Sequence, residues 1–155
     1  MQRIMLDTNE YDKLLVAPHA YDRLLALLAE GKIELLATHI QKDEIMAVED
    51  AIKKARLQAV LSRARMIATR GIVLDVSRFD QSRFGNDEDH KLIEHIRGSR
   101  RDRDTEDALI AATAATDADV LVTDDESLMR RLNSYPSIQC EVITFKELER
   151  RLNAP

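Results

Sequence analysis

The chain has 155 residues, of which 45% are hydrophobic and 33% charged, and its formal net charge is −5. This length and balance predict one domain, residues 1–155, with an aliphatic core, since aromatic residues total only 4%. There is no apolar run of transmembrane length, no N-terminal secretory signal and only one cysteine, Cys140, so we expect a cytoplasmic protein that has no membrane partner.

Strand-like and helical patterns alternate along the chain. Runs of β-prone apolar residues predict strands at residues 3–6, 33–37, 72–76, 120–123 and 141–143. Helical periodicity and capping signals predict helices over residues 21–28, 38 to about 70 in two pieces, 87–97, 105–117, 126–133 and the residues after Thr144. Alternating strands and helices favour an α/β fold in which helices cover both faces of a parallel sheet.

Local signals mark the ends of several of these helices. Thr38 and Gln41 form the pattern of a capping box, and Asn86 can cap the helix over residues 87–97. Gly31 and Gly98 are expected to end helices. The helix over 105–117 is rich in alanine, and its small side chains would let it pack closely against its neighbours and hold Asp107 rigidly near the sheet edge.

Acidic residues stand where strands are followed by helices. Asp7 ends the first strand, Glu44 lies in the first turns of the helix after the second, Asp107 lies in the first turn of the alanine-rich helix, and Asp124 and Asp125 follow the fourth strand. The carboxyl ends of parallel strands share one edge, so these side chains could meet in one pocket. Grouped carboxylates repel one another unless a cation lies between them, and oxygen ligands suit Mg²⁺ or Mn²⁺. The pattern therefore predicts a metal-dependent hydrolase that acts on phosphodiesters.

Each of these acidic residues also has a purely structural explanation. Asp7 could simply end a strand, and Glu44 and Asp107 lie near helix N-termini, where the dipole favours a negative charge by roughly 0.3–1 kcal/mol. Asp124 or Asp125 can cap the helix that begins at Glu126. The joint pattern, with carboxylates at several strand ends that an α/β fold would bring together, favours the site over the separate structural roles.

Basic residues are concentrated in two segments despite the negative net charge. Residues 51–70 contain only basic charged residues, and a second group surrounds residue 100. Basic faces beside an acidic pocket are what a metal nuclease needs to hold phosphates. The candidates for RNA binding are Lys53, Lys54, Arg56, Arg100, Arg101 and Arg103. The alternative for residues 51–70, a solvated helix face, has equal weight.

The chain resembles the PIN domain family, the nuclease fold of VapC-type toxins and related ribonucleases. The matching stretches are Ile4-Met5-Leu6-Asp7-Thr8-Asn9, Lys42-Asp43-Glu44-Ile45, residues 107–114 and residues 120–125. The resemblance implies a three-layer α/β/α sandwich with a parallel sheet of about five strands. It also implies an Mg²⁺- or Mn²⁺-dependent ribonuclease that acts on single-stranded RNA.

The resemblance further implies an acidic quartet of catalytic metal ligands, which comprises Asp7, Glu44, Asp107 and Asp125, with Asp124 as the alternative fourth member. Glu44 could orient the attacking water as a base. Thr8, Asn9 and Thr123 would have secondary roles, as hydrogen-bond partners of the ligands or of phosphate, although Asn9 is more readily explained as the cap of the following helix.

Several functions are compatible with this resemblance. The protein could be the toxin of a toxin–antitoxin pair, with an antitoxin protein as partner, or a stand-alone processing enzyme, and similar proteins commonly form homodimers. The alternative is a non-catalytic PIN-fold module that binds RNA or protein. A haloacid-dehalogenase-type phosphatase is disfavoured because it needs a second aspartate two residues after Asp7, where Asn9 stands.

Overall fold

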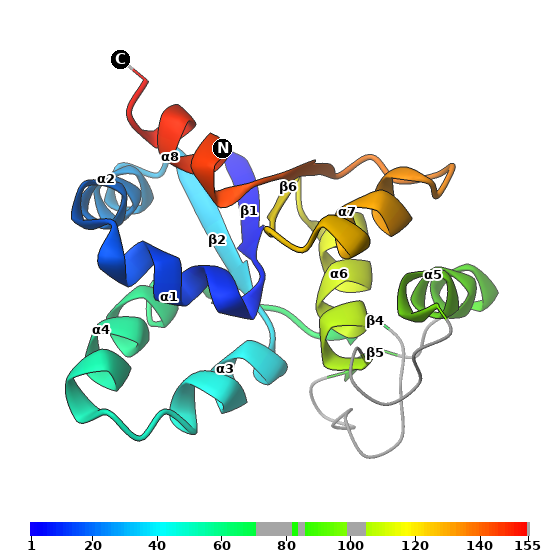
Figure 1. Cartoon of the computed structure of the whole chain (residues 1–155), viewed down its shortest axis with the longest axis horizontal. Helices are drawn as coiled ribbons and strands as arrows, with labels where there is room; N and C mark the ends of the chain where they lie inside the picture. The colour runs from blue at the N-terminus through cyan, green and yellow to red at the C-terminus, as the bar shows by residue number, and fades with distance from the viewer. Residues whose placement is uncertain (71–81, 84–85, 99–104, 155) are drawn as a thin grey trace.

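The computed structural model describes residues 1–70, 82–83, 86–98 and 105–154. Within them, five parallel strands form one sheet in the order β3-β2-β1-β6-β7 (Figure 1). The strands are β1 (Gln2–Leu6), β2 (Ile33–Ala37), β3 (Arg65–Met66), β6 (Val120–Val122) and β7 (Glu141–Ile143). A separate parallel pair consists of β4 (Thr69–Arg70) and β5 (Ser82–Arg83).

Helices cover both faces of the sheet, which makes the fold a three-layer α/β/α sandwich (Figure 1). One face packs against α1 (Thr8–Val16), α2 (Pro18–Ala29), α4 (Ala51–Leu61) and α8 (Phe145–Leu152). The other packs against α5 (Asp87–Arg97), α6 (Thr105–Asp117) and α7 (Glu126–Asn133). The short α3 (His39–Met46) follows β2 at the edge where the strands end. No helix of the described residues is long and apolar enough to cross a membrane.

The strand residues alternate between the two cores. In β1, Ile4 and Leu6 pack into the cluster under α1, whereas Met5 packs into the cluster under α6. In β6, Leu121 likewise faces α6 while its two neighbours face the opposite side. Successive side chains of a strand point to opposite faces, so a sheet covered twice needs apolar residues at nearly every position. This explains why these strands read as uninterrupted hydrophobic runs.

The alanine-rich α6 is the most completely buried helix of the second core. Its alanines at 108, 111, 112 and 114 are at most 1% exposed, as expected from their size. The buried Thr113 hydroxyl donates to the Leu109 carbonyl at 2.6 Å and accepts from the Arg70 backbone N–H at 2.9 Å. Small side chains and this buried hydrogen bond fix α6 closely against the sheet, and with it the acidic first turn.

The capping signals read from the sequence are confirmed. Gln41 accepts from the Thr38 backbone N–H at 2.7 Å at the start of α3, and Asn86 accepts from the Asp89 N–H at 2.9 Å at the start of α5. Gly31 and Gly98 follow α2 and α5 with φ angles of 67° and 59°, a region that glycine adopts without strain. Because these ends depend on local chemistry, the sequence alone identified them.

One expectation about the middle of the chain needs correction. The helical stretch expected to reach residue 70 ends at Leu61, and Arg65–Met66 forms the edge strand β3. Leu36 and Ala37 of β2 pair with these two residues, and the Ala37 carbonyl accepts from the Ile67 N–H at 2.8 Å. The free edge of β2 thus outweighs the local helical propensity of the segment. The strand expected at residues 72–76 lies outside the described residues.

The expected cap of α1 was also wrong. Asn9 is the second residue of the helix and is exposed. Asp7 is the N-cap instead, with extended backbone angles and a side chain that accepts from the Thr8 N–H. The strand leads directly into the helix, so the residue that ends β1 also has to cap α1.

We predict that Gln41→Ala costs about 2–3 kcal/mol of the free energy of unfolding. Gln41 is fully buried; its amide N–H donates to the Leu6 carbonyl and its amide oxygen accepts from the Thr38 backbone N–H. Alanine would therefore leave two buried backbone groups without a hydrogen-bond partner. Urea unfolding followed by circular dichroism measures the change. Gln58→Ala on the neighbouring α4, where the side chain is only partly buried, is the matched control and should stay within about 0.5 kcal/mol.

Candidate active site

Asp7 lies where the order of the strands changes direction. β1 pairs with β2 on one side and with β6, far along the chain, on the other. In open α/β sheets, ligands bind outside the carboxyl ends of the strands at such a point. Asp7 directly follows β1, and its backbone N–H donates to the carbonyl of Val122, the last residue of β6, at 2.9 Å. Asp7 therefore stands at the switch point, at the edge of the sheet where the strands end.

The Asp7 carboxylate is buried, with only 4% of the residue exposed. One oxygen accepts from the Thr8 backbone N–H at 2.8 Å and the other from the Thr123 hydroxyl at 2.9 Å. Burial raises the pKa of Asp7 above its ordinary value, and the negative charge of Asp125 raises it further. The two hydrogen bonds lower the pKa but do not cancel the effect. Loss of solvation, more than repulsion by other charges, is thus the main reason why the pKa of this carboxylate is raised.

Thr123 connects Asp7 to the segment that follows β6. Its fully buried hydroxyl donates to Asp7 and accepts from the Asp125 backbone N–H at 3.1 Å. Asp125 is the N-cap of α7, and its carboxylate accepts from the N–H groups of Ser127 at 2.8 Å and Leu128 at 3.0 Å. Asp125 therefore caps a helix and also lies close enough to Asp7 to raise its pKa.

Asp124 has different partners. One of its carboxylate oxygens accepts from the Lys13 ammonium at 2.6 Å and the other from the Phe145 backbone N–H at 2.8 Å. Burial raises the pKa of Asp124, but the hydrogen bonds from Lys13 and Phe145 outweigh it, so the pKa lies below its ordinary value. Of the two adjacent aspartates, Asp125 is the one whose charge acts on Asp7.

Glu44 approaches Asp7 from α3. Burial raises the pKa of Glu44, and the charges of Glu106 and Asp7 raise it further, whereas the Thr8 hydroxyl lowers it. One carboxylate oxygen, Oε2, is buried and has no hydrogen-bond partner within the part of the chain that the structure describes. Burying a polar group without a partner is costly, so this oxygen is suited to a cation. Gln41, one turn earlier, ties the helix to the end of β1 through the Leu6 carbonyl.

The first turn of α6 contributes an acidic pair. Asp107 is half-buried there, and the preceding Glu106 is exposed. The negative charge of Glu106 raises the pKa of Glu44. Sequence analysis missed Glu106. The signal was its place beside Asp107, since consecutive helical side chains point about 100° apart and an acidic pair covers two directions.

Sequence analysis also missed two charged residues of α1 that lie beside Asp124. Glu10 is 1% exposed, and its carboxylate accepts from Lys13 and from the Asp124 backbone N–H, both at 3.0 Å. Glu10 stands one turn before the buried Leu14, on the face of α1 that points into the protein, and this spacing could have revealed it. A lysine therefore lies beside the cluster, paired with Glu10 and Asp124.

The carboxylates interact as pairs rather than as one closed group. Asp125 raises the pKa of Asp7, and Glu106 and Asp7 raise the pKa of Glu44. Among residues 1–70, 86–98 and 105–154, no three acidic, histidine or cysteine side chains are grouped closely enough to hold a metal ion. The donor set nevertheless fits a hard divalent cation, since it consists of carboxylate oxygens, one of them buried without a partner.

A comparison with known protein families identifies the family of this chain. A family model described as a PIN domain matches residues 3–127, a stretch that contains Asp7, Glu44, Asp107 and Asp125. The chain belongs to the PIN domain family. PIN domains are generally nucleases, so membership supports a hydrolase that acts on nucleic acid. Neither the curated proteins nor the solved structures contain a significant match to the chain.

The basic residues proposed for RNA binding differ in their surroundings. In this PIN domain, Lys53 pairs with Asp12 of α1 at 2.8 Å, and the Arg56 guanidinium lies over the Tyr21 ring, 5.3 Å from its centroid. Lys54 is half-buried on the same helix. These contacts tie α4 to α1 and α2, which supports the structural explanation for this segment. Arg100, Arg101 and Arg103 lie outside the described residues, so their role stays a prediction.

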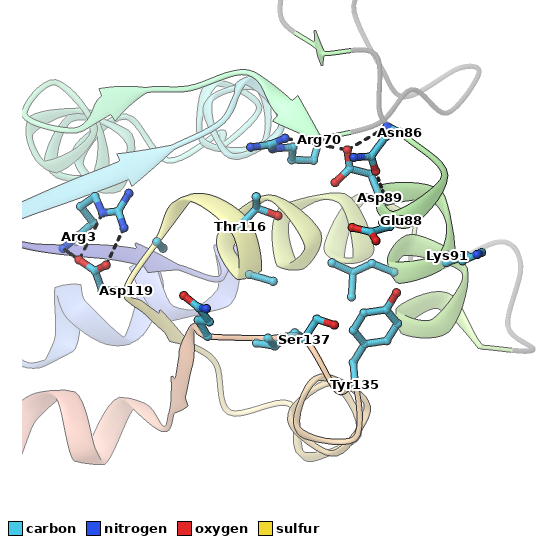
Figure 2. A pocket seen from close by; sticks show the side chains of 15 residues that line it. Arg3, Arg70, Asn86, Glu88, Asp89, Lys91, Thr116, Asp119, Tyr135 and Ser137 are labelled. Carbon is cyan, nitrogen blue, oxygen red and sulfur yellow. Dashed lines mark hydrogen bonds and ion pairs between the residues drawn. The ribbon is translucent and has the colours of Figure 1, made fainter.

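A cavity of about 660 Å³ lies at the opposite edge of the PIN domain (Figure 2). Arg3 and Asp119, which line it, stand at the starts of β1 and β6, whereas Asp7 and Thr123 follow the ends of these strands. Arg3 pairs with Asp119 at 2.7 Å, and Arg70, near the other end, pairs with Asp117 at 3.3 Å. The cavity is therefore separate from the acidic cluster, and its arginines are already neutralised.

We predict that Asp7→Asn stabilises the protein in a chelating buffer near pH 7.5. The pKa of Asp7 is raised on folding, so the charged form is disfavoured in the folded state at any pH above that pKa. The neutral amide removes this cost, and the Thr123 hydroxyl can reverse to accept from it. The advantage should shrink as the pH falls through the raised pKa of Asp7 and be absent below the ordinary value of 3.8, because wild-type Asp7 then takes up a proton.

Urea unfolding at several pH values measures this difference. The control is Asp50→Asn, since Asp50 is the exposed N-cap of α4 and accepts from the Lys53 N–H. Its effect on the free energy of unfolding should not depend on pH over the same range. Equal pH dependence of the two variants would contradict a buried, strained Asp7 carboxylate.

Proposed function

We propose that this PIN domain is a metal-dependent endoribonuclease that cleaves phosphodiesters of single-stranded RNA. The observation that carries the proposal is that Asp7, at the switch point of the sheet, interacts electrostatically with Asp125 and with Glu44, which come from two other segments of the chain. Carboxylates whose pKa values are raised by burial and by one another are the expected signature of a functional site. The family supplies the reaction class, and the oxygen donors supply the preference for a hard cation.

Asp7, Glu44, Asp107 and Asp125 would hold Mg²⁺ or Mn²⁺. The bound cation supplies a water of lowered pKa and stabilises the charge that develops on the phosphate. Asp7 is held in one orientation by Thr8 and Thr123. Glu44, with its unpartnered Oε2, is the residue best placed to orient a water as a base. Asp125 is oriented by the N–H groups that it caps.

The choice of RNA rests on the family resemblance and on the basic residues near residue 100. We further propose that the protein is either a toxin neutralised by an antitoxin protein or a stand-alone processing enzyme, and that it can form a homodimer. A small neighbouring gene for a DNA-binding protein would favour the toxin. The RNA target itself follows from the cut sites.

The alternative function is a non-catalytic PIN-fold module that binds RNA or protein. The observation in its favour is that the described carboxylates are not grouped closely enough to hold an ion as they stand. Under the alternative, the protein would bind RNA with or without a divalent cation and leave it uncut.

The deciding experiment incubates the purified protein with mixed single-stranded RNAs in EDTA, Mg²⁺ or Mn²⁺ and maps the cut ends. A matched single-stranded DNA pool tests the choice of nucleic acid, and Asp7→Asn is the inactive control. Cleavage in the metal arms alone, at recurring positions, is the expected result. Binding without cleavage in every arm would support the non-catalytic module.

We predict that Mn²⁺ raises the thermal midpoint relative to EDTA. A ligand that binds only the folded state stabilises it by RT ln(1 + [L]/Kd), roughly 1.4 kcal/mol at ten times Kd. For a domain of this size, that corresponds to about 3–6 °C. The rise in thermal midpoint should become smaller as the pH is lowered. The pKa values of Asp7 and Glu44 are raised, so protons compete with the cation for them at a higher pH than for ordinary carboxylates. Identical thermal midpoints in EDTA and in Mn²⁺, in samples shown to be folded, would contradict the proposed metal site.

We predict that Asp125→Asn lowers turnover at saturating RNA by more than about tenfold, or about 1.4 kcal/mol of barrier, and that Asp107→Asn does the same. Asparagine keeps the size and the helix cap but removes a charged ligand. Asp124→Asn should cost much less, because Asp124 is bound by Lys13 and Phe145. Circular dichroism must show that all three variants are folded. An inactive Asp124→Asn beside an active Asp125→Asn would exchange the two roles.

A further inference from the structure

Glu10 is a buried carboxylate that the proposed reaction does not use. Its side chain is 2% exposed, and one oxygen accepts from the Lys13 ammonium and from the Asp124 N–H, both at 3.0 Å. Its other oxygen, Oε2, is buried and has no partner within the described part of the chain. A buried ion pair rarely adds much net stability, because desolvation offsets its attraction. The position of Glu10 beside the aspartate pair points to a different role.

Lys13 extends this pair into a network. Its ammonium also donates to one carboxylate oxygen of Asp124 at 2.6 Å, and the other oxygen of Asp124 accepts from the Phe145 N–H at 2.8 Å. Glu10 thus holds the backbone of Asp124, and Lys13 holds its side chain. The network joins α1, the segment after β6 and the first residue of α8.

The network determines which of two adjacent carboxylates joins Asp7. Asp125, the next residue, caps α7, and its backbone N–H donates to the Thr123 hydroxyl, which in turn donates to Asp7. Asp124 is turned toward Lys13 and Phe145 instead. Chemically the two side chains are identical, so only their restraints distinguish them. Without Lys13, the Phe145 N–H would be the only one of these two donors left to the Asp124 carboxylate, which could then rotate and compete with Asp125 for a cation.

We propose that Glu10 and Lys13 are positioning residues, whose network holds Asp124 out of the acidic cluster and leaves Asp125 as the aspartate that works with Asp7. This inference rests on the proposed nuclease function. It assigns Glu10 and Lys13 no contact with the substrate or the cation.

The test compares Lys13→Met, Asp124→Asn and the double variant with the wild type. Lys13→Met should lower kcat for RNA by at least about tenfold while KM changes by less than about threefold, because the chemistry is misaligned and the RNA surface is intact. Adding Asp124→Asn removes the freed carboxylate, so the double variant should return to within about threefold of Asp124→Asn alone. Lys13→Arg, which keeps the charge, should retain most of the activity.

Amide hydrogen exchange supplies a readout that does not depend on activity. The N–H groups of Asp124 and Phe145 donate into the network, so Lys13→Met should speed their exchange by more than about tenfold relative to the other α8 amides. The control is Lys32→Met, which breaks the exposed Lys32–Glu30 pair at the opposite edge of the sheet and should change neither exchange nor kcat. If Lys13→Met does not fold, the comparison is made in the double variant Glu10→Gln/Lys13→Met. The glutamine side-chain oxygen at position 10 can still accept from the Asp124 backbone N–H.

The outcomes separate the two proposals. Loss of turnover in Lys13→Met, its rescue by Asp124→Asn and faster exchange at Asp124 and Phe145 support the positioning role. Loss without rescue, unchanged turnover or unchanged exchange overturns it while the nuclease proposal stands. A wild-type protein that binds RNA but never cuts it overturns both, and this result is recognised before any variant is compared.

Discussion

The burial of one carboxylate, that of Asp7, is the constraint around which the centre of this molecule is organised. Asp7 follows the central strand and caps the helix that comes next. It also accepts a hydrogen bond from the hydroxyl of Thr123, the residue directly after the neighbouring strand β6. A charge in such a place needs donors, and Thr8 and Thr123 supply them. These donors leave the pKa of Asp7 raised. The fold therefore holds a carboxylate in a fixed position that a cation would relieve.

The distribution of positive charge around this point is selective. Lys13 neutralises Glu10 and Asp124, which lie beside the cluster, and its weaker influence on Asp7 does not restore the ordinary pKa. Glu44 has an unpartnered buried oxygen and acidic neighbours. The carboxylates of Glu10 and Asp124 are thus paired with a lysine inside the protein. At the switch point, by contrast, the carboxylates remain available to bind a cation. This contrast supports the proposed cation-dependent chemistry more strongly than the number of acidic residues does.

Rigid packing supports the cluster from two sides. Gln41 joins α3 to the end of β1, which fixes Glu44 relative to Asp7. The buried alanines of α6 bring its acidic first turn close to the sheet, and the Thr113 hydroxyl anchors this helix to the backbone at Arg70. Carboxylates on well-packed helices keep their repulsion, because they cannot move apart as they could on loops. Preorganisation of this kind is what a metal-dependent active site requires.

The sequence by itself determined the alternating α/β pattern, four of the five sheet strands, most helix ends and the positions of the acidic motifs, because each depends on local periodicity or on a cap within a few residues. Only the tertiary structure decided the rest. The edge of β2 recruited Arg65–Met66 as a strand, and the direct passage from β1 into α1 made Asp7 rather than Asn9 the cap. Asp124 obtains Lys13, more than a hundred residues away, as its partner, whereas Asp125 becomes the cap of α7, since identical side chains differ only in the partners that folding gives them.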